Sequence, residues 1–408
     1  MTIVEFVDKS NIDNISSALI RTPERVIFVS SVKRGISSST LERYKAFFKN
    51  RGADIEFTGL SLAPFKVDAI IDAFDKITKK YENCVFDLTG GNESYIVAAA
   101  TVAERFPERN IQLHRYNIES GRIVDLDRDG KTILDGAATP QISVAENIAI
   151  NGGRVIFETE KSSGTRVWDD GVLGDEDVDR MWTICKESPN PWNFAVGVLE
   201  RFVKLENGSL RSLKGDHDPK LPASFSNCPE NTKKIFSKLK NSGLITVETG
   251  SDGRETVTFK SDTVRHCLSK SGNLLELQVY RLAKKAQSGG EKVFTDALTG
   301  VLIDIDGDDG NRLELTNEID VILQRGLKPV FISCKNGDVS NDELYKLKAV
   351  TARFGGKYAK AVLVLGAPKG EVSAANFKER AKEYRISVIE IYNMNDSQFQ
   401  KRIANLAR

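Results

Sequence analysis

The stretch NEIDVILQRGLKPVFISCKNG, residues 317–337, holds two apolar runs separated by a short turn. The runs predict strands over 314–323 and 329–334, and strands joined by so short a turn pair antiparallel. Asp320 lies within the first run and Lys335 follows the second, so their side chains are expected to approach one another. A carboxylate among aliphatic neighbours is costly unless it is paired or bound to a metal. The stretch therefore predicts a hairpin and marks a candidate site.

Helices and further strands surround this hairpin. A helix is expected over 272–287, with Glu276 in the segment GNLLELQVY, and a strand over 301–305 lies between that helix and the hairpin. The rest of the expected elements are helices over 342–354 and 373–384, strands over 361–365 and 388–392, and a terminal helix. Their order predicts a separate α/β domain over residues 269–408.

Glu276, Asp320 and Lys335 are the groups that hydrolysis of a phosphodiester would use. A divalent cation polarises the phosphate and lowers the pKa of bound water. Carboxylates hold such a hard cation through oxygen, and a lysine can orient the water or stabilise the developing charge. The alternative interpretation is a structural ion pair between Asp320 and Lys335, which predicts that cleavage survives in a folded Asp320→Ala protein.

Asp304, Asp306 and Asp308 are similar to the start of a calcium loop. An EF-hand needs Gly at the sixth position and Glu at the twelfth, where this chain has Asp309 and Leu315. A hairpin tip between two strands is therefore the expected structure.

Residues 1–140 alternate strand and helix signals, which predicts a parallel sheet with helices on both faces, a Rossmann-like domain. Strands are expected over 2–7, 25–32, 53–57, 83–88 and 111–117, and helices over 11–20, 39–50, 65–81 and 93–106.

The segment VFDLTGGNES, residues 85–94, ends a buried strand and opens a helix. Ligands of parallel sheets bind beyond the carboxyl ends of the strands, and the free N–H groups of a helix start favour a phosphate. The candidate ligand-binding residues are those of this turn and of the first two strand ends: Ser10, Ser31, Lys33, Thr89, Gly90, Gly91 and Asn92. A tight structural turn is the alternative interpretation.

Residues 141–268 are expected to form a linker and a helical connector. An amphipathic helix over 230–242 and a hairpin over 244–259 follow one another, as at the end of a winged-helix unit. A helical spacer with a plain hairpin is the alternative.

The composition excludes several classes of protein. The 408 residues carry 58 Lys and Arg against 57 Asp and Glu, so any nucleic-acid site must be a local groove. Five scattered cysteines without CxxC spacing indicate neither a disulfide framework nor a zinc site, which favours a cytoplasmic protein. We find no signal peptide and expect no membrane span.

Residues 270–392 resemble the PD-(D/E)xK nuclease superfamily. Asp320 matches the Asp of that motif, Lys335 its Lys, and Glu276 the upstream helical Glu. The position two before the Lys, usually acidic, is Ser333. The resemblance implies that the backbone carbonyl of Cys334, with Glu318 as a further candidate, completes a site for Mn²⁺ or Mg²⁺. The NEID and ISCKNG segments are specifically similar to nucleases of CRISPR systems.

Residues 1–140 resemble the CARF domain, the Rossmann-fold sensor of type III CRISPR systems, most specifically at DLTGGN. The resemblance implies a homodimer that binds a cyclic oligoadenylate, most commonly cyclic tetra-adenylate, across a two-fold axis. Lys33 and residues 89–92 are the positions carried over from the family.

Together the two resemblances imply a nuclease, allosterically activated by a cyclic oligoadenylate, that cleaves single-stranded RNA or DNA or nicks duplex DNA in antiviral defence. Five basic residues are expected to line a substrate groove: Lys328, Lys346, Lys348, Arg353 and Lys357. The alternative function is a ligand-responsive winged-helix regulator without nuclease activity. A metabolic enzyme is less favoured, because the sequence lacks a nucleophile–base pair and a dinucleotide fingerprint.

Overall fold

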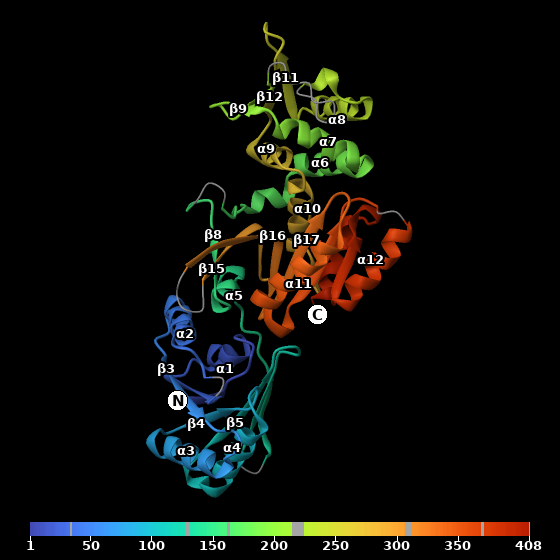
Figure 1. The fold of residues 1–408 in the computed structure, drawn as a ribbon. Coiled ribbons are helices and arrows are strands. Elements are labelled where there is room, and N and C mark those ends of the chain that lie inside the picture. Colours follow the sequence, from blue (N-terminus) through green and yellow to red (C-terminus); the bar gives the residue numbers. More distant parts are fainter. Residues whose placement is uncertain are drawn as a thin grey trace.

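The computed structural model describes residues 1–32, 35–127, 130–160, 164–213, 224–306, 312–368 and 371–407. Their strands form a seven-stranded sheet at the bottom of Figure 1, a six-stranded sheet in the centre and a four-stranded sheet at the top, besides one two-stranded ribbon. We call the parts built on these sheets the N-terminal, C-terminal and middle units. No helix within these residues is long and apolar enough to cross a membrane.

The seven-stranded sheet has the order β3-β2-β1-β4-β5-β6-β7. Its strands are β1 (Thr2–Phe6), β2 (Arg25–Ser31), β3 (Glu56–Leu62), β4 (Cys84–Asp87), β5 (Gln112–Asn117), β6 (Arg122–Leu126) and β7 (Thr132–Ala137), and its helices are α1 (Asp13–Arg21), α2 (Ser38–Asn50), α3 (Val67–Lys80) and α4 (Glu93–Arg105). The first five strands are parallel, and α1 and α2 cover one face while α3 and α4 cover the other. This confirms the predicted Rossmann-like architecture.

Two features of this unit differ from the sequence prediction. The edge strand β3 lies over 56–62 rather than 53–57, because an edge strand with polar and glycine residues has little apolar periodicity. The antiparallel hairpin β6–β7 was not predicted, because its short strands are interrupted by charged residues.

The six-stranded sheet has the order β19-β18-β17-β16-β15-β8. Its strands are β8 (Gly153–Ile156), β15 (Asp296–Asp306), β16 (Arg312–Arg325), β17 (Lys328–Lys335), β18 (Lys360–Leu365) and β19 (Ile386–Glu390), with helices α5 (Val144–Ile150), α10 (Asn273–Lys284), α11 (Asn341–Gly355), α12 (Glu371–Glu383) and α13 (Asp396–Leu406). β15 to β17 are antiparallel and β17 to β19 parallel. The predicted strand pair around residues 317–337 is confirmed.

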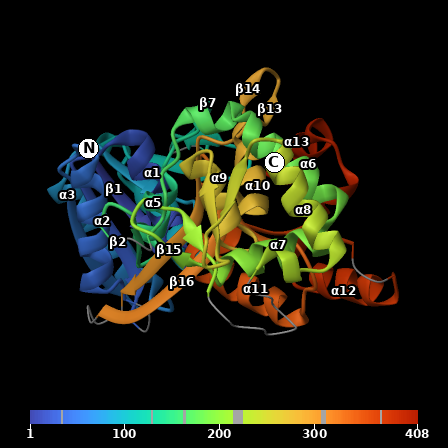
Figure 2. The ribbon, with the colours of Figure 1, turned by 90° about the horizontal axis from the view of Figure 1, so that it is seen from above.

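The segment expected as a linker contributes to this sheet. β8 pairs with β15 as its edge strand, and Arg154 of β8 lies 3.7 Å from Asp304. Asp304 lies in β15 and Asp306 ends that strand, whereas Asp308 is outside the described residues. The two described aspartates therefore belong to a strand, as expected. β15 and β16 extend toward the N-terminal unit (Figures 1 and 2).

The middle unit contains α6 (Glu176–Glu187), α7 (Pro189–Glu200), α8 (Glu230–Asn241), α9 (Asp262–Ser269) and a sheet of order β11-β12-β10-β9, formed by β9 (Val203–Lys204), β10 (Leu210–Arg211), β11 (Ile245–Thr249) and β12 (Glu255–Phe259). Its apolar core continues without a break into α10, α13 and one face of the six-stranded sheet. The continuous core joins the middle and C-terminal units.

The N-terminal and C-terminal units meet around α5. Arg51, which follows α2, forms an ion pair of 2.6 Å with Glu146 on α5. Lys357 forms an ion pair of 2.7 Å with Asp13 of α1, a carboxylate that is 1% exposed. The Lys328 ammonium donates to the Glu119 carbonyl at 3.2 Å. Polar contacts thus connect the two units.

Candidate active site

Asp320 lies at the point where β16 and β17 diverge. Regular pairing of the two strands begins at Val321 and Ile332, so Asp320 is one residue beyond it. Its Oδ2 atom accepts a hydrogen bond of 2.6 Å from the Cys334 backbone N–H and one of 3.2 Å from the Ser333 hydroxyl. These donors fix the carboxylate, although burial raises the pKa of Asp320.

Glu276 lies in the first turn of α10, and the helix begins after Gly272. Gly272 has a φ of +106°, and a Cβ placed on it would lie 3.2 Å from Glu276 Oε1. The carboxylate of Glu276 therefore folds back against the helix start. Burial and the neighbouring Asp320 carboxylate raise the pKa of Glu276 to about 8. The two carboxylates are close enough to oppose one another's ionisation.

Lys335 is the last residue of β17, and its ammonium faces both strands and α11. The Nζ atom lies 3.1 Å from Glu343 Oε2 and 4.0 Å from Asp320 Oδ2. Burial favours the neutral amine, but the Asp320 and Glu343 carboxylates outweigh it and raise the pKa of Lys335. The lysine is therefore charged, and Glu343 is its nearer partner.

These side chains line one cavity of about 510 Å³ between the C-terminal and middle units. Its wall includes Asn193 of α7 and Lys270 and Ser271 ahead of α10. The Ser271 N–H donates to Glu200 Oε1 at 2.7 Å, and Lys270 forms an ion pair of 2.7 Å with Glu318. The structure thus brings together Glu276, Asp320 and Lys335, the residues expected from the acidic and basic pattern, and Glu318, which the resemblance implied.

Several contributors to this cavity were not predicted, among them Glu343, Asn193 and Asn336. Glu343 lies two residues into α11, and Asn193 and Asn336 bridge the middle and C-terminal units through a hydrogen bond of 2.9 Å. A carboxylate in the first turn of the helix that follows Lys335 was a usable signal for Glu343. The sequence contains no comparable signal for Asn193, which is about 140 residues away.

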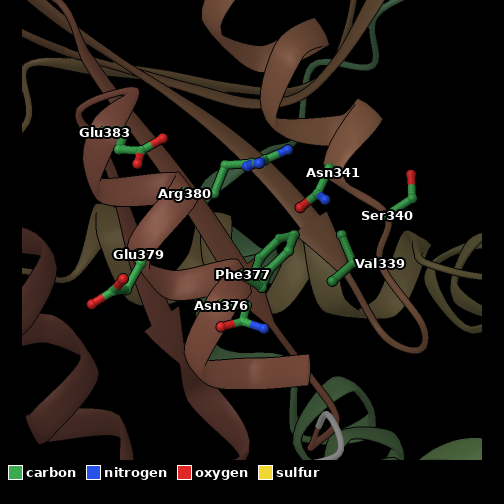
Figure 3. Close-up of a pocket in the computed structure, with 8 residues that line it drawn as sticks. All are labelled: Val339, Ser340, Asn341, Asn376, Phe377, Glu379, Arg380 and Glu383. Carbon is green, nitrogen blue, oxygen red and sulfur yellow. The ribbon is translucent and has the colours of Figure 1, made fainter. Parts of the chain in front are cut away.

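A second cavity, of about 610 Å³, lies between the start of α11 and α12. Figure 3 shows Arg380 directed toward Asn341, with Val339 and Phe377 as apolar lining. Its carboxylates, on Glu379 and Glu383, are one turn apart on α12 and exposed. The cavity between α11 and α12 is the larger one, but its two carboxylates are exposed. It therefore lacks a pair of half-buried carboxylates such as Glu276 and Asp320.

The donor chemistry around Glu276 and Asp320 fits a hard divalent cation. Both groups offer oxygen, and a cation between them would offset the burial that raises both pKa values and the Asp320 charge that raises the pKa of Glu276 further. Within the described ranges, no group of three or more His, Cys, Asp or Glu side chains is arranged to hold a metal. The fit therefore rests on two carboxylates.

The turn over residues 88–92 in the N-terminal unit is held by internal contacts. The Thr89 hydroxyl accepts from the Tyr116 N–H at 2.9 Å, and the Asn92 side chain caps α4 by accepting from the Ser94 N–H at 2.9 Å. Gly90 and Gly91 pack directly on β1. Close packing on β1 therefore explains why positions 90 and 91 are glycines, whether or not a ligand binds there.

The other candidate residues of the N-terminal unit are at different places. Ser31 ends β2, and Ser10 is 7% exposed and directed toward Gly356 of the C-terminal unit. Lys33 lies outside the described residues. Ser10 thus lies at the contact between units.

Replacing Gly91 by Ala is expected to destabilise the fold by about 2–4 kcal/mol. Gly91 has a φ of +91°, and a Cβ there would lie 2.3 Å from Phe6 Cβ, which cannot move independently of β1. Chemical denaturation measures the loss. The control is Gly52→Ala, where φ is +78° but nothing lies within 4 Å of the added atom. An equal loss in both variants would contradict the packing account.

Only part of the expected basic groove is present near the site. Lys346 lines the cavity that contains Glu276 and Asp320, and it forms an ion pair of 3.1 Å with Glu343. Lys348 lies over the Tyr384 ring and Arg353 near the Phe354 ring. The prediction is wrong for Lys328 and Lys357, because both are directed to acceptors of the N-terminal unit.

No family model matches the sequence, and a search of the curated proteins finds no match. Solved structures do match. VC1899 from Vibrio cholerae is 18% identical, with a TM-score of 0.71 over 99% of this chain and 97% of that chain. Can2 from Sulfobacillus thermosulfidooxidans, solved in complex with cyclic tetra-adenylate, is 17% identical, with a TM-score of 0.67 over 100% and 99%. The chain shares the fold of these two proteins along its whole length.

Proposed function

We propose that the protein is a divalent-metal-dependent nuclease activated by a cyclic oligoadenylate. The observation that carries the proposal is the pair Glu276 and Asp320, which oppose one another's ionisation in a cavity that also receives the Lys335 ammonium. A structural ion pair between Asp320 and Lys335 would not need Glu276. It would also bring Lys335 closer to Asp320 than to Glu343, whereas the distances are 4.0 and 3.1 Å.

In the proposed mechanism, Glu276 and Asp320 would hold Mn²⁺ or Mg²⁺, together with the Cys334 carbonyl. The cation would stabilise negative charge on a phosphate oxygen and favour ionisation of water. Ser333, where related nucleases have an acid, donates to Asp320 and so orients a ligand instead of adding one. Glu343 holds Lys335 in position to donate to the phosphate or to the attacking water.

The activator would bind at the strand ends of the N-terminal unit in a homodimer. Three large apolar side chains are exposed there, namely Val32 after β2, Phe65 after β3 and Val97 on α4, at 67%, 96% and 56%. Such exposure favours burial against a second copy. Cyclic tetra-adenylate is the proposed activator, since Can2, which shares this fold, was solved with it.

Activation would act through the contact between units. The activator must bind the active arrangement more tightly than the inactive one. The Lys357–Asp13 pair connects α1, which follows β1, with the end of α11, whose start carries Glu343. A shift at the strand ends would thus reach the candidate active site through α11.

Replacing Glu343 by Gln is expected to reduce the cleavage rate by roughly 10- to 100-fold, because Lys335 loses the carboxylate that holds it. Single-turnover cleavage measures the rate, and Glu379→Gln, in the second cavity, is the matched control. A rate equal to that of the wild type would exclude Glu343 as a positioning residue.

The proposed function is tested with labelled single-stranded RNA, single-stranded DNA and supercoiled plasmid, with and without Mn²⁺ and with and without cyclic tetra-adenylate. Cleavage that requires both the metal and the activator is the expected result, and it identifies the substrate. Activator binding without cleavage of any substrate would overturn the nuclease and favour the winged-helix regulator.

A further inference from the structure

The middle unit has the strand and helix order of a winged helix. β10, which precedes α8, pairs with β12, and β12 pairs with β11, so the first strand lies beside the last. α8 ends at Asn241 and leads directly into the hairpin β11–β12, which begins at Ile245. In Figure 1 this hairpin projects at the top of the molecule, away from the N-terminal unit. A helix followed by a projecting hairpin is the DNA-reading half of that fold.

The inner face of α8 is anchored in the core of the middle unit. Thr232, Ile235, Phe236 and Leu239 are buried, and the Phe236 ring stacks on Phe225 with 3.9 Å between centroids. The helix is therefore held rigidly by one face, and its other face is open to solvent.

Beyond the exposed carboxylate of Glu230 in its first turn, which pairs with Lys233, the open face of α8 carries only amide, hydroxyl and ammonium groups. Asn231, Lys234, Lys238 and Asn241 recur every three or four residues and are exposed, with Ser237 beside them. No Asp or Glu occurs from residue 231 to residue 247, which includes four lysines. Lys238 also reaches the exposed Glu187 of α6, a surface pair of little energetic weight. From Asn231 onward the face is thus positive and rich in groups that bind phosphates and base edges.

The dimensions suit double-helical DNA. Twelve residues of α-helix are about 18 Å long, and the major groove, about 12 Å wide, admits one helix. Lysine pairs with guanine and asparagine with adenine in that groove. At the tip of the adjoining hairpin, the exposed Asp252 contacts two half-buried arginines, Arg254 of the hairpin and Arg211 of the neighbouring β10, which could exchange it for a phosphate.

The middle unit is also coupled to the candidate active site. α7 contributes Asn193 to the cavity that holds Glu276 and Asp320, and Glu200 at its end accepts from the Ser271 N–H. Because the core of the middle unit continues into α10, a duplex held on α8 would keep a fixed position relative to Glu276.

We propose that α8 and the hairpin β11–β12 form a binding surface for duplex DNA, separate from the cavity where cleavage takes place. The surface would hold a duplex while the cavity cuts a strand of it. The role of holding a duplex for cleavage rests on the proposed nuclease function, but the binding of duplex DNA does not.

The test is fluorescence anisotropy of a labelled 20-base-pair DNA with the full chain in EDTA, over a range of salt concentrations. The double variant Lys234→Gln/Lys238→Gln is expected to bind about tenfold more weakly, with a salt slope smaller by about 2. Lys45→Gln/Lys49→Gln is the matched control, since it removes two exposed lysines at the same spacing on α2. The double variant Lys234→Arg/Lys238→Arg should bind like the wild type.

Unchanged affinity and salt slope in the α8 variant, at an unchanged melting temperature, would overturn the proposal. Tighter binding of single-stranded DNA or RNA than of duplex would also overturn it. Binding of duplex through Lys234 and Lys238 by a protein that cleaves nothing would support the proposal while the proposed nuclease function fails.

Discussion

An Asp320→Asn protein is expected to lose cleavage by about a thousandfold or more while it folds and binds the activator normally. The amide has the shape of the carboxylate and an oxygen that can still accept from the Cys334 N–H, but it lacks the charge that holds a cation. Because burial raises the pKa of Asp320, the ionised group opposes folding, and the variant should unfold at the same or a higher temperature without metal.

Single-turnover cleavage and thermal unfolding measure the two effects. Asp304→Asn is the matched control, since Asp304 is a mostly buried aspartate of β15 that faces Arg154 outside the cavity. If a folded Asp320→Asn protein cleaved at the wild-type rate, a catalytic role for Asp320 would be excluded. The structural ion pair with Lys335 would then be its remaining role. A lower unfolding temperature in the metal-free variant would show that the carboxylate stabilises the fold.

The second large effect is a dependence of metal-free stability on pH. The pKa of Glu276 in the folded protein is about 8, well above its ordinary value of 4.5. The folded state therefore retains a proton that the unfolded state has lost, so the free energy of unfolding falls as the pH rises from about 4.5 to 8, by up to a few kcal/mol. Above that range the contribution no longer changes.

Mg²⁺ should reverse this trend, because a cation favours the ionised carboxylates. We expect the increase in melting temperature on adding Mg²⁺ to be larger at pH 8 than at pH 6. Denaturant unfolding between pH 5 and 9, with and without Mg²⁺, measures both effects. Glu276→Gln should flatten the pH profile and abolish most of the Mg²⁺ effect. A wild-type profile that is flat, or that rises toward pH 8, would contradict the carboxylate pair.

The sequence predicted the candidate site where local pattern and chemistry agree. Asp320 and Lys335 lie on neighbouring strands joined by a tight turn, so their proximity follows from the hairpin alone. The assignment of Glu276 to the site also depended on the family resemblance, because the sequence of a helix does not indicate which strand the helix packs against. Asn193 was not predictable, since it reaches the cavity only through the packing of α7 against the C-terminal unit.

The fold was predicted best where apolar periodicity is strong. The buried strands β1, β2 and β4 match their predicted positions closely. β8 was predicted as part of a linker, because a strand of four residues is too short to show periodicity. Its partner strand β15 also lies about 150 residues later in the sequence. Gly90 and Gly91 were predicted as part of a ligand-binding turn. The structure shows that they also pack against Phe6.

The most direct test of the account is a crystal structure of the protein soaked or grown with Mn²⁺, with anomalous diffraction measured at the manganese edge. The account predicts one anomalous peak in the cavity at about 2.2 Å from carboxylate oxygens of both Glu276 and Asp320. A fully occupied manganese site elsewhere, with Glu276 and Asp320 free of it in crystals of protein that cleaves nucleic acid in solution, would contradict the central claim.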